Sequence, residues 1–412
     1  MIQSATQSRR RNTGAIRAIT FLMFMMFAMT TDSVGIIIPE IIKTFGLSMT
    51  AAGTFQYATM TGIALAGFFL GGLADSFGRK RTILVGLAVF AVSSYLFAAG
   101  NSFVYFSILL GAGGIGIGVF KTGALALIGD LSRSSKEHTS LMNTVEGFFG
   151  VGSIIGPAIL SRLLATGASW KGLYILAGTM CVLLIVIATR ANYPQAVRSD
   201  KNLEQGSSLR HTVAAMHNPY ALSFSMGCFL YVAAEAAIYV WMPTLLADYK
   251  GSAATLATYS ISIFFILRAA GRFIGAWMLE RFYWTSVLAL FSGLILICFV
   301  ASVAGGAGVA VYLLPASGLF MSVIYPSINS KGISCFPKSE HGAIAGVILF
   351  FTCLSAVIGP LAMGAVSDAM GGAKFGFILA TGFAALLFLG LFFNWVFDPT
   401  REHLNRLEAT EY

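Results

Sequence analysis

The sequence predicts an all-α membrane protein in which twelve transmembrane helices form two pseudo-symmetric halves of six. Three observations lead to this fold class. The 412-residue chain is 57% hydrophobic and only 10% charged, whereas about a quarter of the residues of a globular protein are charged. Its apolar stretches reach the roughly 20 residues that a membrane-spanning helix needs. Short motifs also recur about 203 positions later in the chain, which indicates a duplication.

Twelve stretches qualify as spans, with boundaries placed to within a few residues. We expect them at residues 16–42, 50–75, 81–100, 102–129, 139–165, 171–191, 219–247, 254–280, 284–305, 307–333, 340–367 and 374–397. The long polar connector at 192–218 is expected to be a cytoplasmic linker, which separates a first half (1–191) from a second half (219–397) and a tail (398–412). The first apolar run is longer than a signal peptide, so we expect it to be a retained span.

The distribution of Lys and Arg predicts the orientation. If both termini are cytoplasmic, 18 of the 26 Lys and Arg residues lie in inside segments, five lie outside and three lie within spans, as cytoplasmic enrichment of these residues requires. The net charge of +9 therefore reflects orientation, and no nucleic-acid partner is expected. We expect a multi-pass protein of the bacterial inner membrane that works as a monomer in the lipid bilayer.

The duplication pairs acidic residues of the two halves. Ile155-Gly156-Pro157 recurs at positions 358–360, an offset of 203. The same offset carries Asp32 in the first span onto Glu235 in the seventh, and an offset of 205 carries Asp75 onto Glu280. Parallel six-helix halves with a solute between them account for such matches.

The connector after the second apolar run reads GGLADSFGRKR from Gly71 to Arg81. Asp75 stands four residues before the cations, so charges can pair across a helix end, while Gly71 and Gly78 allow close backbone approach and a tight turn. The pattern resembles the loop between the second and third helices of the major facilitator superfamily of secondary transporters. We expect a conformational latch here, made by Gly71, Asp75, Gly78, Arg79, Lys80 and Glu280.

Five ionisable residues fall inside predicted spans: Asp32, Lys121, Glu146, Glu235 and Arg268. Such residues are costly in a bilayer and mark functional sites by default. Three acids and two bases leave one carboxylate without an obvious partner, and such a group can load and release a proton. We assign this proton coupling to Asp32 and Glu146. The alternative is that Asp32 with Lys121, and one Glu with Arg268, are structural pairs.

The fifth span contains NTVEGFFGVGSIIGP. Asn143 and Glu146 are three residues apart and share a helix face, which we expect to face the cavity. Gly152 and Gly156 are four apart and form an edge of small residues on which another helix can close.

The seventh and tenth spans supply the other expected solute contacts. Glu235, Tyr239 and Trp241 place a carboxylate beside aromatic rings, an arrangement that suits a sugar because sugars need hydrogen-bond acceptors and stack on rings. Trp241 fits equally well in the aromatic belt at the membrane interface. Tyr325 and Asn329, one turn apart, are further partners for hydroxyl groups.

The fourth span carries GAGGIGIGVFKTG, a glycine-rich run that does not end in Gly-Lys-Ser/Thr and so excludes a nucleotide-binding loop. Its Lys121 is a buried cation, which a neutral hexose does not need. A sugar acid or another carboxylate would need it.

Three segments indicate which branch of the superfamily the sequence resembles. VEGFFGVGSIIGP, YVAAEAAIYVWMP and FMSVIYPSI resemble the fucose permease branch of the superfamily, the proton-linked fucose, glucose and galactose symporters. The resemblance implies sugar uptake by alternating access, with acids in the first and the fourth or fifth helices coupling the proton. Asp32 and Glu146 occupy such places. The charged loop and the GxxxGP motif also resemble those of drug exporters.

The sequence therefore favours a proton-coupled sugar symporter, with a small-molecule solute and a proton as its partners. A sugar-acid or organic-anion carrier that uses Lys121 and Arg268 is one alternative, and a drug or solute proton antiporter is another. A receptor or scaffold is disfavoured, because no soluble sensor domain is evident. No nucleophile, metal cluster or cofactor loop appears, so we expect neither an enzyme nor a bound metal or cofactor.

Overall fold

The computed structural model of this chain describes residues 2–70, 77–131, 135–191, 193, 217–336, 341–401 and 404. Every regular element in this part of the chain is a helix, so the all-α prediction is confirmed. Among the described residues, ten stretches are long and apolar enough to cross a membrane: Thr13–Phe45, Phe103–Ile128, Thr144–Ala165, Lys171–Arg190, Pro219–Leu246, Ser260–Arg281, Trp284–Gly305, Ala307–Ser334, Val347–Met370 and Ala373–Phe397. The total of twelve stays a prediction. The two other expected spans correspond to α4, which has 17 described residues, and to α6, which begins with three cations.

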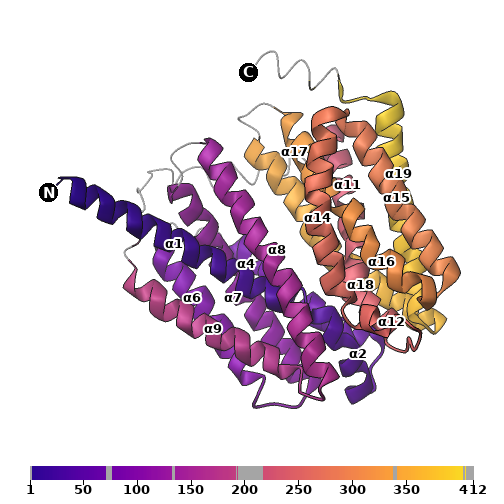
Figure 1. Ribbon diagram of the computed structural model, residues 1–412, viewed down its shortest axis with the longest axis horizontal. Helices are drawn as coiled ribbons and strands as arrows, with labels where there is room; N and C mark the ends of the chain where they lie inside the picture. The colour runs from indigo at the N-terminus through magenta and orange to yellow at the C-terminus, as the bar shows by residue number, and fades with distance from the viewer. Residues whose placement is uncertain are drawn as a thin grey trace. The chain divides into compact units, whose positions relative to one another are not determined.

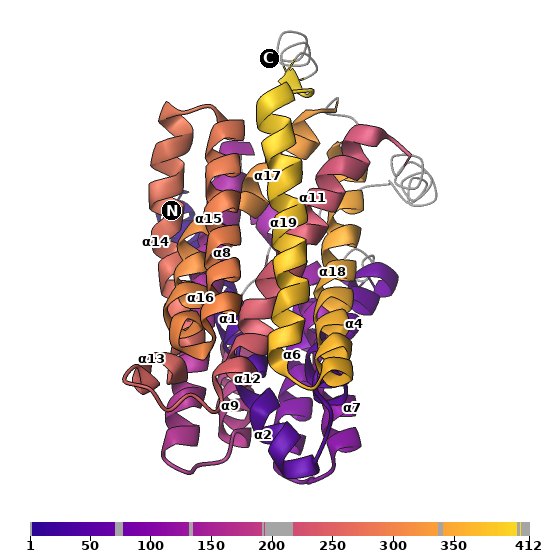
Figure 2. The same ribbon diagram turned by 90° about the vertical axis from the view of Figure 1, so that its right-hand side faces the viewer.

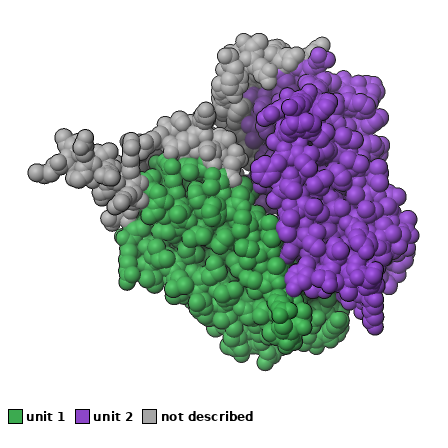
Figure 3. Space-filling view, in the orientation of Figure 1, with its two compact units in different colours: residues 1–47, 54–198 green, residues 48–53, 199–412 purple. Residues whose placement is uncertain are grey.

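The chain divides into two compact units, shown in different colours in Figure 3. Unit 1 comprises residues 1–47 and 54–198, and unit 2 comprises residues 48–53 and 199–412. A short segment from the first part of the sequence, Ser48–Gly53, thus belongs to the second unit by its contacts.

Unit 1 is a bundle of long helices, drawn from indigo to magenta in Figure 1. Its helices are α1 (Ile2–Thr31), α2 (Val34–Phe45), α4 (Thr54–Leu70), α6 (Arg79–Leu96), α7 (Phe103–Leu131), α8 (Ser135–Ala165) and α9 (Lys171–Arg190). Helix α7 packs against both α4 and α6, while α1 packs against α8.

Unit 2 is a second helical bundle, and its later helices are drawn in orange and yellow in Figure 2. It contains α3 (Met49–Ala52), α11 (Pro219–Ala236), the π-helical turn η1 (Ala237–Trp241), α12 (Met242–Leu246), α13 (Ala254–Thr258), α14 (Ser260–Arg281), α15 (Trp284–Gly305), α16 (Ala307–Met321), α17 (Ile324–Ser334), α18 (His341–Met370) and α19 (Ala373–Phe397). Helix α18 packs against α11, and α14 packs against α16.

Glycines bring helices into backbone contact in unit 1. A Cβ atom on Gly152 would collide with the backbone oxygen of Met25, and one on Gly156 would collide with that of Met29. The predicted small-residue edge of the fifth span is therefore confirmed, and the helix that closes on it is α1. Such close approach increases the packing contacts that hold helices together in a membrane.

Three of the expected spans are interrupted near their middle. The first breaks at Asp32 and Ser33, between α1 and α2, and the tenth breaks at Ser322 and Val323, between α16 and α17. The seventh passes through the π-helical turn η1. Each interruption releases backbone groups from regular α-helical hydrogen bonding, and within a bilayer other protein groups must then satisfy them. Such interruptions often mark functional sites in membrane transporters.

Candidate functional site

Asp32 lies at the break of the first span. Its backbone N–H still donates to the carbonyl of Ala28 at 3.1 Å, whereas Ser33 turns its hydroxyl back to the carbonyl of Met29 at 2.6 Å. These two bonds satisfy two of the carbonyls near the end of α1, where the chain leaves the helix. The break places the Asp32 carboxylate, which is half-buried, at the junction of α1 and α2.

Two hydroxyls contact the Asp32 carboxylate. Thr31 donates to Oδ1 at 3.2 Å, and Ser153 of α8 donates a short hydrogen bond to Oδ2. Ser153 is fully buried, and its hydroxyl also lies 3.1 Å from the carbonyl of Phe149. A single hydroxyl proton serves one acceptor at a time, and a carboxylate is the stronger acceptor of the two.

Lys121 and Glu146, the other predicted charges of unit 1, lie on α7 and α8. The ammonium of Lys121 is 5.5 Å from the ring centroid of Phe149, close enough for a cation–π contact. Glu146 stands three residues before Phe149 on the same helix and is exposed. Among the described residues, neither Lys121 nor Glu146 forms an ion pair within 4 Å, so the alternative in which Lys121 pairs with Asp32 is not seen.

Unit 2 contains a buried ion pair. The guanidinium of Arg268 on α14 lies 2.8 Å from Oε1 of Glu235 on α11. Glu235 is only 7% exposed. Tyr231, one turn earlier on α11, donates to the same carboxylate oxygen at 2.9 Å and lies 3.0 Å from the carbonyl of Met321 at the end of α16. One tyrosine thus joins the ion pair to the break in the tenth span. The predicted alternative in which a Glu pairs with Arg268 is realised by Glu235.

The aromatic residues after Glu235 have separate environments. Trp241 is 1% exposed and donates its indole N–H to the carbonyl of Pro360 on α18 at 3.1 Å. Tyr239 is half-buried within η1. Because a π-helical turn holds more residues than an α-helical turn, it changes the register of Tyr239 relative to Glu235 from the regular four-residue step.

The predicted residues of the tenth span lie on α17, after the break. The ring of Tyr325 is 6.1 Å from that of Tyr231, which places it beside the Glu235–Arg268 pair. Asn329 is half-buried one turn later. Asn143 belongs to α8, but its side chain is outside the described residues.

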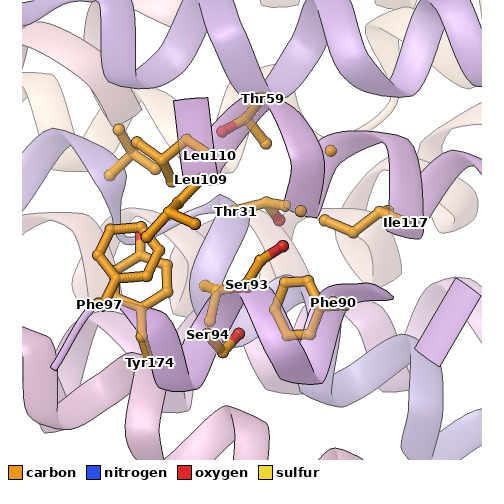
Figure 4. Close-up of a pocket in the computed structure, with 14 residues that line it drawn as sticks. Thr31, Thr59, Phe90, Ser93, Ser94, Phe97, Leu109, Leu110, Ile117 and Tyr174 are labelled. Atoms are coloured by element: carbon orange, nitrogen blue, oxygen red, sulfur yellow. The ribbon is translucent and has the colours of Figure 1, made fainter. Parts of the chain in front are cut away.

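A small cavity lies inside unit 1, and Thr31 is among the residues that line it (Figure 4). Its volume is about 20 Å³, which is enough for one water molecule. The lining residues include Thr31, Thr59, Ser93, Ser94 and Tyr174, and the surface that they present to the cavity is mostly apolar. The hydroxyl of Tyr174, which is buried, has no hydrogen-bond partner among the described residues.

Sequence reasoning missed Ser153, Thr31 and Tyr231. Ser153 follows Glu146 by seven residues, which is two helical turns and therefore the same face. Tyr231 precedes Glu235 by four residues, so helical spacing could have identified it too. Nothing in the local sequence marks Thr31, because its role depends on the break at Asp32.

The charged connector is described from Phe77 onward, so Gly71 and Asp75 lie outside the described residues. Gly78 has a φ of 86°, which confirms the predicted tight turn. Arg79 forms an ion pair with Asp130 at the end of α7, at 2.9 Å. The expected counterpart in the second half, Glu280, is exposed at the end of α14.

Lys80 contacts the end of α9. Its ammonium donates to the carbonyls of Thr189 and Ala191, both at 2.8 Å. It also lies 5.5 Å from the ring centroid of Tyr193. Burial raises the pKa of Tyr193 to about 12, so the phenol is neutral at physiological pH. A cation near the C-terminal carbonyls of a helix is favoured by the helix dipole.

Comparison with known proteins identifies the family. The model of the Major Facilitator Superfamily matches residues 20–360. A glucose/galactose transporter of Brucella abortus is 25% identical over 389 residues, covering 90% of this chain and 92% of that protein. The L-fucose-proton symporter of Escherichia coli is 25% identical over 395 residues, covering 86% and 87%. A crystal structure of the E. coli fucose:proton symporter superimposes with a TM-score of 0.63 at 21% identity, covering 92% and 98%. The chain belongs to the major facilitator superfamily of transporters.

Proposed function

We propose that this chain is a proton-coupled sugar symporter that works by alternating access in the bacterial inner membrane. The observation that carries the proposal is that hydroxyls donate hydrogen bonds to Asp32, an acid at the break of the first span. Asp32 and Glu235 occupy corresponding positions of the duplicated halves. Asp32 is held by hydroxyls, whereas Glu235 is held by a guanidinium. Relatives described as a glucose/galactose transporter and an L-fucose-proton symporter support a sugar as the solute and a proton as the coupling ion.

The contacts of Asp32 suit a residue that gains and loses a proton. A hydroxyl donates to a carboxylate and accepts from a carboxylic acid, so Ser153 can remain bonded to Asp32 in both protonation states. Protonation of Glu235 would instead remove the negative charge on which its ion pair with Arg268 depends. We therefore assign proton coupling to Asp32, with Glu146 on the neighbouring α8 as the second candidate.

The contacts of unit 2 suit a neutral solute. The Glu235–Arg268 pair fixes a carboxylate and a guanidinium side by side, and Arg268 keeps 22% of its side chain exposed. Sugar hydroxyls both donate and accept hydrogen bonds, so such a pair can bind them with one partner of each kind. Tyr325, beside Tyr231, supplies an aromatic face, and Tyr239 and Asn329 are further contacts within this proposal. Trp241 and Asn143 belong to the predicted solute set, but the indole of Trp241 is packed against α18.

A second candidate function is transport of a sugar acid or another organic anion. Lys121 favours it, because this ammonium contacts Phe149 and has no carboxylate within 4 Å among the described residues. A charge-assisted contact to a solute carboxylate would satisfy it. Arg268 contributes less to this reading than the sequence suggested, because Glu235 already neutralises it.

Uptake into proteoliposomes tests the proposal most directly. The purified chain is reconstituted and challenged with radiolabelled neutral sugars, sugar acids and cationic dyes, with and without an inside-alkaline pH gradient. We expect the gradient to drive accumulation of a neutral sugar. Accumulation of a sugar acid alone would establish the anion carrier, and gradient-driven extrusion of a dye would establish an antiporter.

A further inference from the structure

An open groove lies between two helices of unit 2, α15 and α19, which pack against each other (Figure 2). Its volume is about 380 Å³. It is lined by a stripe of α15 that runs from Ser286 to Ile297 and by three aromatic residues of α19, Phe388, Phe392 and Trp395. These described residues include no charged side chain, and the surface that they present is almost entirely apolar. The groove therefore suits a hydrocarbon chain.

A row of aromatic rings and one glycine shape the groove. The ring centroid of Phe392 lies 5.5 Å from that of Phe388 and 5.5 Å from that of Trp395, so the three rings form a continuous wall on α19. Across from them, a Cβ on Gly293 would lie 3.2 Å from the ring of Phe388, so glycine lets this ring approach α15. One turn away in each direction, Leu290 and Ile297 on α15 stay 50% and 62% exposed. An apolar ligand can cover both.

The groove has the depth of one leaflet of a bilayer. From Ser286 to Ile297, α15 rises ~16 Å, which is about half of a hydrocarbon core ~30 Å thick. Ser286 lies near the start of α15, and Trp395 lies near the end of α19. The groove therefore reaches the end of these spans at which the connector before α15 and the C-terminal tail are expected to be cytoplasmic.

Two arginines lie at this end of the groove. Burial raises the pKa of Tyr283, the carboxylate of Asp398 raises it further, and the positive charge of Arg401 lowers it, so these three groups lie close together. Arg281 is two residues before Tyr283, and its guanidinium lies 4.4 Å from the ring centroid of Trp277. Both arginines are exposed, and among the described residues neither forms an ion pair within 4 Å. They can therefore attract an anionic headgroup.

The acids at this end favour Arg401 over Arg281 as the contact for a phosphate. Glu280 is exposed and adjoins Arg281 at the end of α14. Asp398 hydrogen-bonds to Tyr283, and its Oδ1 is buried, so this carboxylate points into the protein while Arg401 points outward.

We propose that the groove between α15 and α19 binds an anionic phospholipid, with one acyl chain along the groove and the phosphate at Arg401. A zwitterionic lipid carries its own cation beside the phosphate, so it gains less from the arginine. The bound lipid contacts both helices and so holds α15 against α19. The proposal requires a chain that spans a membrane but no particular solute or coupling ion.

Lipids with brominated acyl chains test whether a chain occupies the groove. Bromine quenches tryptophan fluorescence on contact, and Trp395 belongs to the groove wall. The purified chain in detergent is titrated with brominated phosphatidylglycerol or brominated phosphatidylcholine, and the quenching that Trp395→Phe removes is assigned to this site. We expect half-maximal quenching of Trp395 at a phosphatidylglycerol concentration about tenfold lower than that of phosphatidylcholine. Equal concentrations for the two lipids would overturn the proposal.

The same titration tests the role of Arg401. In Arg401→Gln, we expect the two half-maximal concentrations to come within about twofold of each other, because the charge-assisted contact to the phosphate is lost. Arg190→Gln is the matched control, because it changes an exposed arginine at the end of α9 in unit 1, and it should keep the tenfold preference. A preference that survives in Arg401→Gln would refute the assignment of the phosphate.

Filling the groove provides an independent test by native mass spectrometry. Leu290→Trp places a larger side chain in the groove, whereas Leu386→Trp changes a leucine of α19 that is 56% exposed outside it. We expect the Kd of the most tightly bound phosphatidylglycerol to rise about tenfold in Leu290→Trp and to stay unchanged in Leu386→Trp. Equal Kd values would contradict the proposal. Dimers that Leu290→Trp separates would also overturn it, because a second copy of the chain would then cover the groove. None of these measurements uses a solute, so their outcome is independent of the sugar proposal.

Discussion

The hydroxyl of Ser153 donates a hydrogen bond to Oδ2 of Asp32 and so joins the middle of α8 to the break between α1 and α2. Helix α8 also carries Glu146, two turns before Ser153. A change of protonation at Asp32 therefore alters a hydrogen bond to α8, the helix that carries Glu146. The glycine contact of α8 with α1 brings these two helices close together near this hydrogen bond, because no side chain separates the two backbones.

Proton coupling should be separable from solute binding. In Asp32→Asn or Glu146→Gln, we expect counterflow exchange to persist while accumulation driven by a pH gradient is lost, because the proton site is removed and the solute site is not. In Glu235→Gln, binding and exchange should weaken together. Both assays are run in the same liposomes, with the exposed Asp248→Asn as the control. Gradient-driven accumulation that survives in both Asp32→Asn and Glu146→Gln would refute this assignment.

The Glu235–Arg268 pair should have a measurable structural cost when one partner is removed. Glu235→Gln leaves the guanidinium without its counter-charge, and we expect a loss of about 2 kcal/mol of stability, seen as a lower Tm in detergent. Replacing both partners, as in Glu235→Gln with Arg268→Met, should recover most of this loss but not solute binding. A double variant as unstable as the single one would show that the pair does not determine stability.

Lys121 distinguishes a neutral solute from an anionic one. For an anionic solute, Lys121→Gln should raise the Kd by about tenfold or more, because a charge-assisted contact is lost from a poorly screened site. For a neutral sugar, the Kd should change little. If Lys121 only balances Asp32, adding Asp32→Asn should restore what the single variant lost. Equilibrium binding of a sugar acid and its neutral parent sugar to each variant measures the difference.

Two adjacent glycines of α7 should respond oppositely to alanine. Gly113 lines the small cavity of unit 1, and a Cβ on it would lie 3.6 Å from Phe90, an ordinary contact. Gly113→Ala should therefore stabilise the protein by about 1 kcal/mol through helix propensity. A Cβ on Gly114 would collide with the backbone oxygen of Thr59, so Gly114→Ala should destabilise by about 2 kcal/mol. Thermal unfolding of the pair gives the comparison, and equal shifts would contradict it.

The sequence predicted what depends on local composition. Apolar length identified the helices, and small residues four apart identified the edge at Gly152 and Gly156, which α1 closes. The tight turn at Gly78 followed from the same local reasoning. These features are readable because each is determined by residues within one or two helical turns.

Features that depend on residues far apart in the chain could not be predicted from the sequence. The pairing of Glu235 with Arg268 requires the packing of α11 against its neighbours, and sequence spacing left several pairings open. The contact of Asp368 with Met49 joins residues 319 positions apart. The π-helical turn after Glu235 contains no proline or glycine that would have indicated an irregular helix. Tertiary packing, rather than propensity, decides these cases.

The two hydrogen bonds of Lys80 have a mechanical consequence. They hold the carbonyls of Thr189 and Ala191 where the chain leaves α9 and enters the connector between the halves. The start of α6 and the end of α9 are therefore held together by this one side chain. A displacement of the start of α6 is therefore transmitted to the end of α9, although the two segments are more than a hundred residues apart in sequence.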